Sequence, residues 1–74
     1  MISDLQKDTL LKFGRHLEIL RKRKKLSYRK IALNGDVDYS DISKIEKGDK
    51  NSTLLNIVEL AKALEIPLKE LMDF

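Results

Sequence analysis

The chain has 74 residues, of which 42% are hydrophobic and 36% are charged, and its formal net charge is +3. This length allows one small domain, residues 1–74, and the composition is typical of a globular helical protein rather than a disordered or fibrous one. The sequence contains no cysteine, which excludes a disulfide framework, and no apolar run approaches the roughly 20 residues of a membrane span. We therefore expect a cytoplasmic domain that is held together by its apolar core.

The first predicted element is a long helix that starts between Ser3 and Asp8. Ser3 and Gln6 have the spacing of a capping box, and apolar residues then recur at helical spacing. The predicted buried stripe consists of Leu10, Phe13, Leu17 and Leu20. The helix is expected to end near Lys25, where cations favour the negative end of the helix dipole.

A short second helix is predicted from Tyr28 to about Gly35, with Ser27 as its N-cap and with Ile31 and Ala32 facing inward. Residues 34–36, Asn-Gly-Asp, form a turn signal because these residue types tolerate positive φ.

A third helix follows, capped by Asp38 and supported by the negative charge of Asp41 in its first turn. Ile42 and Ile45 are expected to face the core, and Gly48 is expected to end this helix in the left-handed conformation.

The last part of the chain predicts two more helices. One runs from about Leu54 to Leu64, and the other runs from Leu68 to Met72 after Pro67, whose missing N–H is tolerated at a helix start. The residues expected to be buried in the fourth helix are Leu55, Val58, Ala61 and Leu64. The sequence therefore predicts an all-α fold, a compact five-helix bundle.

Positive charge is concentrated in one segment of the chain. Seven of the ten residues from Arg21 to Lys30 are Lys or Arg. Such a run commonly forms only a solvated helix face, but here it lies beside two short helices joined by a turn. Clustered cations next to this pattern are typical of phosphate contact, so we expect double-stranded DNA as the partner.

Several short motifs resemble those of the phage repressor/Cro-type helix-turn-helix family, also called the XRE family. The match covers about residues 13–71. The matching positions are Gly14, Leu17, Arg21, Leu26-Ser27, Ile31-Ala32, Val37, Ile42-Ser43, Ile45-Glu46, Gly48, Leu60-Ala61 and Ala63-Leu64. This resemblance implies a lambda repressor-like domain that acts as a transcriptional regulator, commonly as a homodimer on a palindromic operator. The chain is also similar to the controller proteins of restriction–modification systems.

The resemblance also implies roles for individual residues. Arg21 and Glu46 correspond to an internal ion pair of the family, which makes both residues structural. Tyr28 stands where the family usually has a Gln that touches the DNA backbone, and Asp36 stands where it favours Gly. Tyr can still donate a hydrogen bond, and Asp tolerates the left-handed conformation better than most residues.

The DNA-reading residues are expected at the start of the third helix, which meets base edges in helix-turn-helix proteins. Because Ile42 and Ile45 point inward, their neighbours point outward. The candidates for base reading are Tyr39, Ser40, Asp41, Ser43 and Lys44. The candidates for contact with the DNA backbone are Tyr28, Arg29, Lys30, Lys47, Lys50 and Asn51.

The acidic residues Asp36, Asp38 and Asp41 argue against simple DNA binding, because carboxylates repel phosphates. An alternative function is therefore a protein-interaction module, such as an antitoxin-like protein, on the same scaffold. The nearby cations and the positive end of the helix dipole favour DNA.

The apolar C-terminal end predicts a dimer face. Its residues are Leu68, Leu71, Met72 and Phe74. The alternative is that some of these side chains close the core of the monomer.

Enzyme activity and metal binding are not expected. His16 is the only histidine, and without cysteine or a second histidine no transition-metal site is credible. No nucleophile and base have a recognisable spacing, so we expect no catalytic residues. We also expect no cofactor and no small-molecule ligand. As a DNA-binding regulator, the protein is expected to be associated with the nucleoid.

Overall fold

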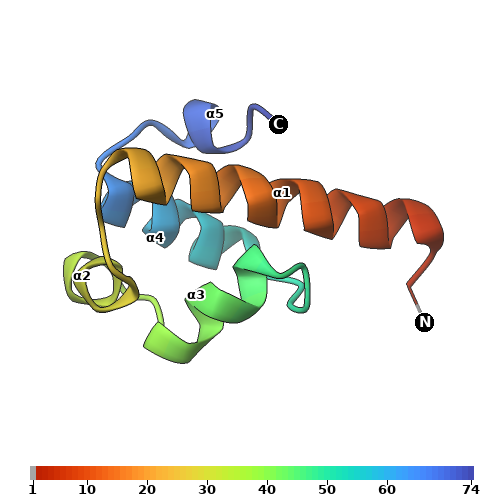
Figure 1. Ribbon diagram of the computed structural model, residues 1–74, viewed down its shortest axis with the longest axis horizontal. Helices are drawn as coiled ribbons and strands as arrows, with labels where there is room; N and C mark the ends of the chain where they lie inside the picture. Colours follow the sequence, from red (N-terminus) through yellow and green to blue (C-terminus); the bar gives the residue numbers. More distant parts are fainter. Residues whose placement is uncertain (1) are drawn as a thin grey trace.

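The computed structural model describes residues 2–74, and all regular secondary structure in that range is α-helical (Figure 1). The helices are α1 (Asp4–Arg23), α2 (Tyr28–Asn34), α3 (Tyr39–Glu46), α4 (Leu54–Leu64) and α5 (Leu68–Leu71). The predicted all-α fold is confirmed. α4 has the predicted bounds, whereas α1 ends two residues earlier than expected. Within residues 2–74, every helix is too short or too polar to span a lipid bilayer.

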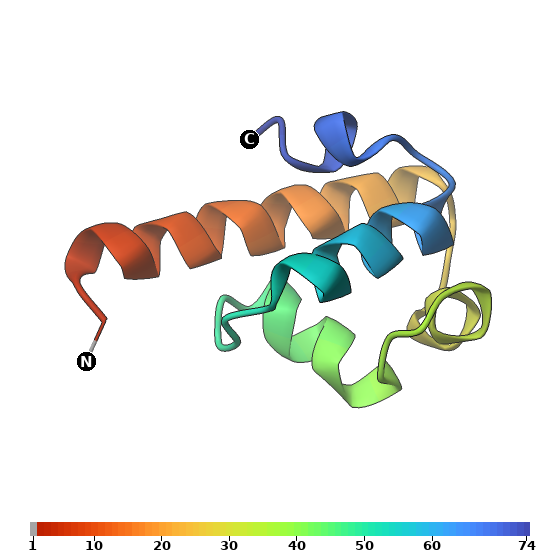
Figure 2. The same ribbon diagram turned by 180° about the vertical axis from the view of Figure 1, so that it is seen from behind.

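α1 is the long central element, and its N-terminal part extends beyond the other helices (Figures 1 and 2). α3 packs against α1 from one side, while α5 contacts both α1 and α4 on the other side. α2 packs against α3 and α4. This arrangement leaves α2 and α3 together at one end of the molecule, away from α5.

Side-chain caps account for the starts of four helices. The capping box is present, because Gln6 N donates to Ser3 Oγ at 3.1 Å and Ser3 N donates to Gln6 Oε1 at 2.9 Å. Ser27, Asp38 and Thr53 accept from backbone N–H groups at the starts of α2, α3 and α4. These bonds satisfy amide donors that have no partner within their own helix.

The buried core draws on all five helices. Its residues are Phe13, Leu17, Leu20, Ile31, Ile42, Ile45, Leu60, Ala61, Ala63, Leu64 and Leu71. Leu10, predicted to lie in the buried stripe of α1, is only half-buried.

The burial predicted for α4 is partly wrong. Leu55 is 75% exposed and Val58 is also exposed, whereas Leu60 and Ala63 are fully buried. α4 has apolar residues on most of its circumference, so spacing alone does not decide which face turns inward. Packing against α2 decides it, because Gly35 lies directly against α4.

The turn after α2 also differs from the prediction. Gly35 has an extended φ of −145°, and neither Asn34 nor Asp36 has a positive φ. Gly35 is needed for space, since a Cβ atom there would lie 2.7 Å from the carbonyl oxygen of Glu59. Gly48, in contrast, has the predicted left-handed conformation, with a φ of 76°.

Candidate nucleic-acid interface

The position of α3 is determined by its close contact with α1. Ile42 and Ile45 are buried beneath it, and Gly14 of α1 lies against its last turn. A Cβ atom at Gly14 would clash with the carbonyl oxygen of Ile45 and would lie 2.7 Å from that of Glu46. The missing side chain thus lets the two helices approach until backbone meets backbone.

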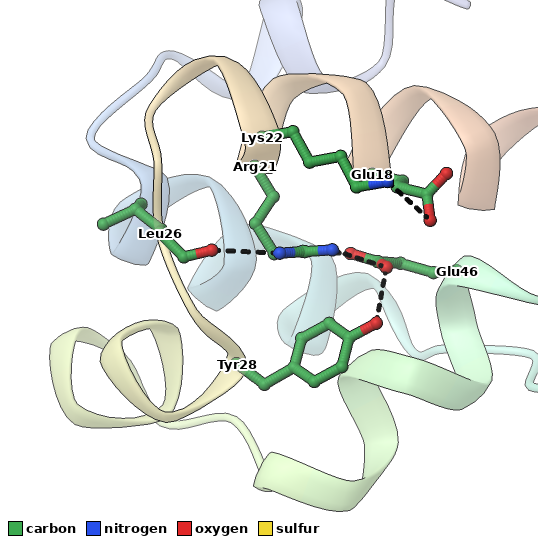
Figure 3. Close-up of polar contacts among 6 residues, drawn as sticks. All are labelled: Glu18, Arg21, Lys22, Leu26, Tyr28 and Glu46. Carbon is green, nitrogen blue, oxygen red and sulfur yellow. Dashed lines mark hydrogen bonds and ion pairs between the residues drawn. The ribbon is translucent and has the colours of Figure 1, made fainter.

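Arg21 and Glu46 form the ion pair that the family resemblance implies (Figure 3). Arg21 Nε lies 2.6 Å from Glu46 Oε2, and Arg21 Nη2 donates to Glu46 Oε1 at 3.2 Å. Arg21 Nη1 donates to the carbonyl oxygen of Leu26 at 3.0 Å. The side chains are only 13% and 3% exposed, and the hydrogen bond to Glu46 raises the pKa of Arg21. This bidentate pair ties the end of α3 to α1 and to the chain that leads into α2.

Tyr28 joins the same network. Its hydroxyl donates to Glu46 Oε1 at 2.8 Å, and the guanidinium of Arg21 lies 4.5 Å from the centre of its ring. The hydrogen bond to Glu46 raises the pKa of Tyr28. The proton of the Tyr28 hydroxyl, which was predicted to be donated to the DNA backbone, is thus engaged inside the domain (Figure 3).

The outward face of α3 carries most of the residues predicted to read bases. Tyr39, Ser40 and Lys44 are exposed, and Ser43 is half-buried. The ring of Tyr39 packs edge-on against that of Tyr28, with centroids 6.2 Å apart and an interplanar angle of 86°. The first residue of α3 is thus braced by α2 while it remains accessible.

The acidic side chains near the start of α3 have partners. Asp38 Oδ1 accepts from the backbone N of Ser40 at 3.0 Å and from its hydroxyl at 3.1 Å, and these bonds lower the pKa of Asp38. Lys50 Nζ lies 3.5 Å from Asp41 Oδ1, and both side chains are partly buried. Lys50 and Asp41, predicted to bind phosphate and base respectively, are therefore engaged with each other.

The remaining residues predicted to contact the DNA backbone are all exposed. Arg29 and Lys30 are exposed on α2, Lys47 is exposed at the C-cap of α3, and Asn51 is exposed in the loop before α4. Of these residues, Arg29 lines a hollow together with Tyr39 of α3, and Lys47 directly follows α3. Such groups are suited to neutralise or hydrogen-bond phosphates.

The run of cations at the end of α1 is less concentrated in space than in sequence. Lys22 Nζ lies 3.7 Å from Glu18 Oε2 on the same helix, and Lys24 Nζ donates to the carbonyl oxygen of Glu65, after α4, at 3.4 Å. With Arg21 bound to Glu46, three of the seven cations in this segment have partners inside the domain.

The predicted dimer face is corrected at one position. Leu71 is fully buried in the core of the monomer, because α5 folds back onto α1 and α4. Leu68, Met72 and Phe74 are exposed. The ring of Phe74 also packs edge-on against Phe13, with centroids 5.5 Å apart, so it belongs partly to its own domain.

His16 has a structural partner. Its Nε2 lies 2.9 Å from the carbonyl oxygen of Glu70, which connects α1 to α5. Among residues 2–74, no group of three or more His, Cys, Asp or Glu side chains is placed to hold a metal ion.

Leu33 is a surface residue that sequence reasoning missed. It is 76% exposed on α2, and together with Arg29, Ala32 and Tyr39 it lines an open hollow of about 430 Å³. Its position two residues after the buried Ile31 already places it on the opposite side of a helix. That signal was present in the sequence.

Comparisons with known proteins agree with the predicted resemblance. A family model described as Helix-turn-helix matches residues 17–71. The control protein C.BamHI from Bacillus amyloliquefaciens is 38% identical over 65 residues, which cover 86% of this chain and 80% of that protein. The control protein C.MunI from Mycoplasma sp is 38% identical over 67 residues, which cover 89% of this chain and 90% of that protein.

A solved structure is similar over nearly its whole length. The crystal structure of the restriction-modification controller protein C.AhdI from Aeromonas hydrophila matches with a TM-score of 0.83 and 40% identity. The match covers 88% of this chain and 98% of that one. The backbone described above therefore has the same fold as a controller protein.

Proposed function

Because the chain belongs to the Helix-turn-helix family, in the XRE class of DNA-binding transcription regulators, we propose that it controls restriction–modification genes by placing α3 in the major groove of an operator. The observation that carries this proposal is the geometry of α3. Tyr39, Ser40 and Lys44 are exposed on a helix whose opposite face is buried and whose end is clamped by the Arg21–Glu46 pair. A base-reading helix requires this rigid outward presentation.

The exposed side chains have chemistry suited to base edges. Lys44 is a donor for the acceptors of guanine, and the hydroxyls of Ser40 and Ser43 donate or accept. Tyr39 offers an apolar ring for contact with a thymine methyl group. Arg29, Lys30, Lys47 and Asn51 are exposed, and in this proposal they contact phosphates on either side of α3.

The acidic residues weigh less against DNA binding than their sequence positions indicate. Asp38 is engaged as the N-cap of α3, and Asp41 lies beside Lys50, whose charge offsets its own. The N-terminus of α3 contributes a further partial positive charge.

We also propose that two copies bind together on a palindromic operator, because one helix reads too few base pairs for useful specificity. Leu68, Met72 and Phe74 are exposed near the C-terminus. α4, which packs against α5, adds a second group of exposed apolar residues. These are Leu54, Leu55 and Val58. Neighbouring apolar surfaces of this kind mark protein interfaces.

The DNA-binding proposal is tested by selecting bound sequences from a random duplex library and titrating the selected duplex at two salt concentrations. We expect a two-fold symmetric site and an affinity that falls steeply with salt. Absence of salt-dependent binding to any duplex would overturn the proposal and would favour the protein-interaction module.

The dimer proposal is tested by comparing Leu55→Asp with Leu5→Asp in sedimentation experiments. The two leucines are 75% and 76% exposed and lie in the first turns of α4 and α1, so the substitutions are closely matched. We expect the Leu55 variant to be monomeric and the Leu5 variant to remain dimeric. If the two variants had the same oligomeric state, the exposed apolar residues of α4 would be excluded from the dimer interface.

A further inference from the structure

The open hollow between α2 and α3 is an apolar feature on a surface bordered by cations. It measures about 430 Å³ and is lined by Arg29, Ala32, Leu33 and Tyr39. Leu33 is 76% exposed and Tyr39 is 53% exposed. An apolar surface left in water is unfavourable, and covering it favours binding of a partner that carries an apolar group of suitable size.

One wall of the hollow, the ring of Tyr39, is held in place by contacts that lead toward the core. The ring of Tyr39 packs edge-on against Tyr28, with centroids 6.2 Å apart. Tyr28 is in turn fixed by its hydrogen bond to Glu46 and by the guanidinium 4.5 Å from the centre of its ring. A wall held in this way loses little conformational freedom when a ligand enters.

We infer that this hollow receives the 5-methyl group of a thymine in the operator, an inference that rests on the proposed function. The thymine methyl is the apolar group that a base pair presents in the major groove. Tyr39 is the first residue of α3, so the hollow lies where the reading helix begins. Arg29, which also lines the hollow, supplies a positive charge for a neighbouring phosphate. An apolar hollow next to a cation therefore suits DNA, which carries apolar methyl groups on a negatively charged backbone.

This assignment gives Leu33 and Ala32, which lie on α2, a part in sequence selection. A cytosine or guanine at the same position has no methyl group and leaves the hollow unfilled. The hollow therefore favours thymine over these bases, because they lose the apolar contact. Burial of one methyl group corresponds to about a fourfold change in Kd for each half-site.

The test replaces each thymine of the selected duplex by deoxyuridine, one position at a time, which removes only the methyl group. Kd is measured by fluorescence anisotropy for the wild-type protein and for the Leu33→Ala and Tyr39→Ala variants. Ile19→Ala, at an exposed apolar residue of α1, is the matched control. Circular dichroism verifies that each variant is folded.

For the wild type and the control we expect one position per half-site where deoxyuridine weakens binding about fourfold. In the Leu33 and Tyr39 variants, the ratio of the Kd for the deoxyuridine duplex to the Kd for the thymine duplex is expected to fall toward one, whatever their overall affinity. If the wild type binds the duplex tightly but is indifferent to deoxyuridine at every position, the inference fails while the proposed function stands. It fails equally if both variants keep the full preference. Failure to bind any duplex overturns both.

Discussion

Tyr28, the first residue of α2, and Glu46, the last residue of α3, join the two helices through the Tyr28 hydroxyl, which donates to Glu46 Oε1 at 2.8 Å. Arg21 binds the same carboxylate and also lies over the Tyr28 ring. The carboxylate of Glu46 therefore receives hydrogen bonds from α1 and α2 while it belongs to α3. This one acceptor therefore links α1, α2 and α3.

Removal of that acceptor is expected to destabilise the domain severely. Glu46→Ala leaves Arg21, whose side chain is only 13% exposed, without its partner, which costs about 3–5 kcal/mol of the free energy of unfolding. Asp8→Ala is the control, because the Asp8–Lys12 pair is 3.1 Å long but 54% and 64% exposed. Urea unfolding is expected to show a large loss for the first variant and an unchanged midpoint for the second. Equal midpoints for the two variants would contradict a structural role for the pair.

Tyr28→Phe separates the internal role of the hydroxyl from a role in phosphate contact. Loss of the bond to Glu46 is expected to lower the free energy of unfolding by about 1 kcal/mol. The affinity of the folded protein for DNA is expected to stay unchanged, because the hydroxyl is engaged with Glu46. Weaker DNA binding with unaltered stability would instead assign the hydroxyl to the DNA backbone.

The same variant makes a prediction about pH. The pKa of Tyr28 is raised above its ordinary value of 10.0, because the hydrogen bond to Glu46 requires the proton. The stabilisation is therefore fully present below pH 10 and is lost as the pH rises through the raised pKa. Measured from pH 7 to above pH 10, the stability difference between wild type and Tyr28→Phe is expected to be constant at first and then to shrink.

Gly14→Ala is expected to push α3 away from α1. The added methyl group would meet the carbonyl oxygens of Ile45 and Glu46, which belong to helix backbone and have little room to shift. Overpacking of this kind costs about 1–3 kcal/mol, although alanine otherwise favours helix over glycine. Lys12→Ala, at an exposed position of the same helix, is the control. Thermal unfolding would refute the close contact if Gly14→Ala proved as stable as wild type.

Exposed cations beside α3 are expected to determine the salt dependence of DNA binding. Arg29→Ala and Lys47→Ala should each reduce the log–log slope of affinity against salt by about one unit. Lys69→Ala, at an exposed cation on α5, should leave the slope unchanged, because α5 lies on the other side of α1 from α3 (Figure 1). Titration of the selected duplex at several salt concentrations measures all three. A slope that changes equally in the α5 variant would mean that the binding surface lies elsewhere.

The helices and their order could be predicted from local patterns in the sequence. Ser3, Ser27 and Asp38 act within three residues of their own position, and the structure shows each of them as a cap. Interactions of such short range can be read without knowledge of the fold. The motif around Ile42, Ile45 and Gly48 likewise predicted the helix-turn-helix arrangement.

Which helix surfaces meet could not be predicted in this way, because it depends on how whole helices pack. α4 is apolar on most sides, so its contact with α2 selected Leu60 and Ala63 for the core and left Leu55 in solvent. Leu71 is buried because α5 folds back, and the Tyr28 hydroxyl turns inward because Glu46 lies opposite it. Each of these outcomes depends on groups many residues apart in the chain. The distance in space between these groups is set by the packing of whole helices rather than by any local sequence pattern.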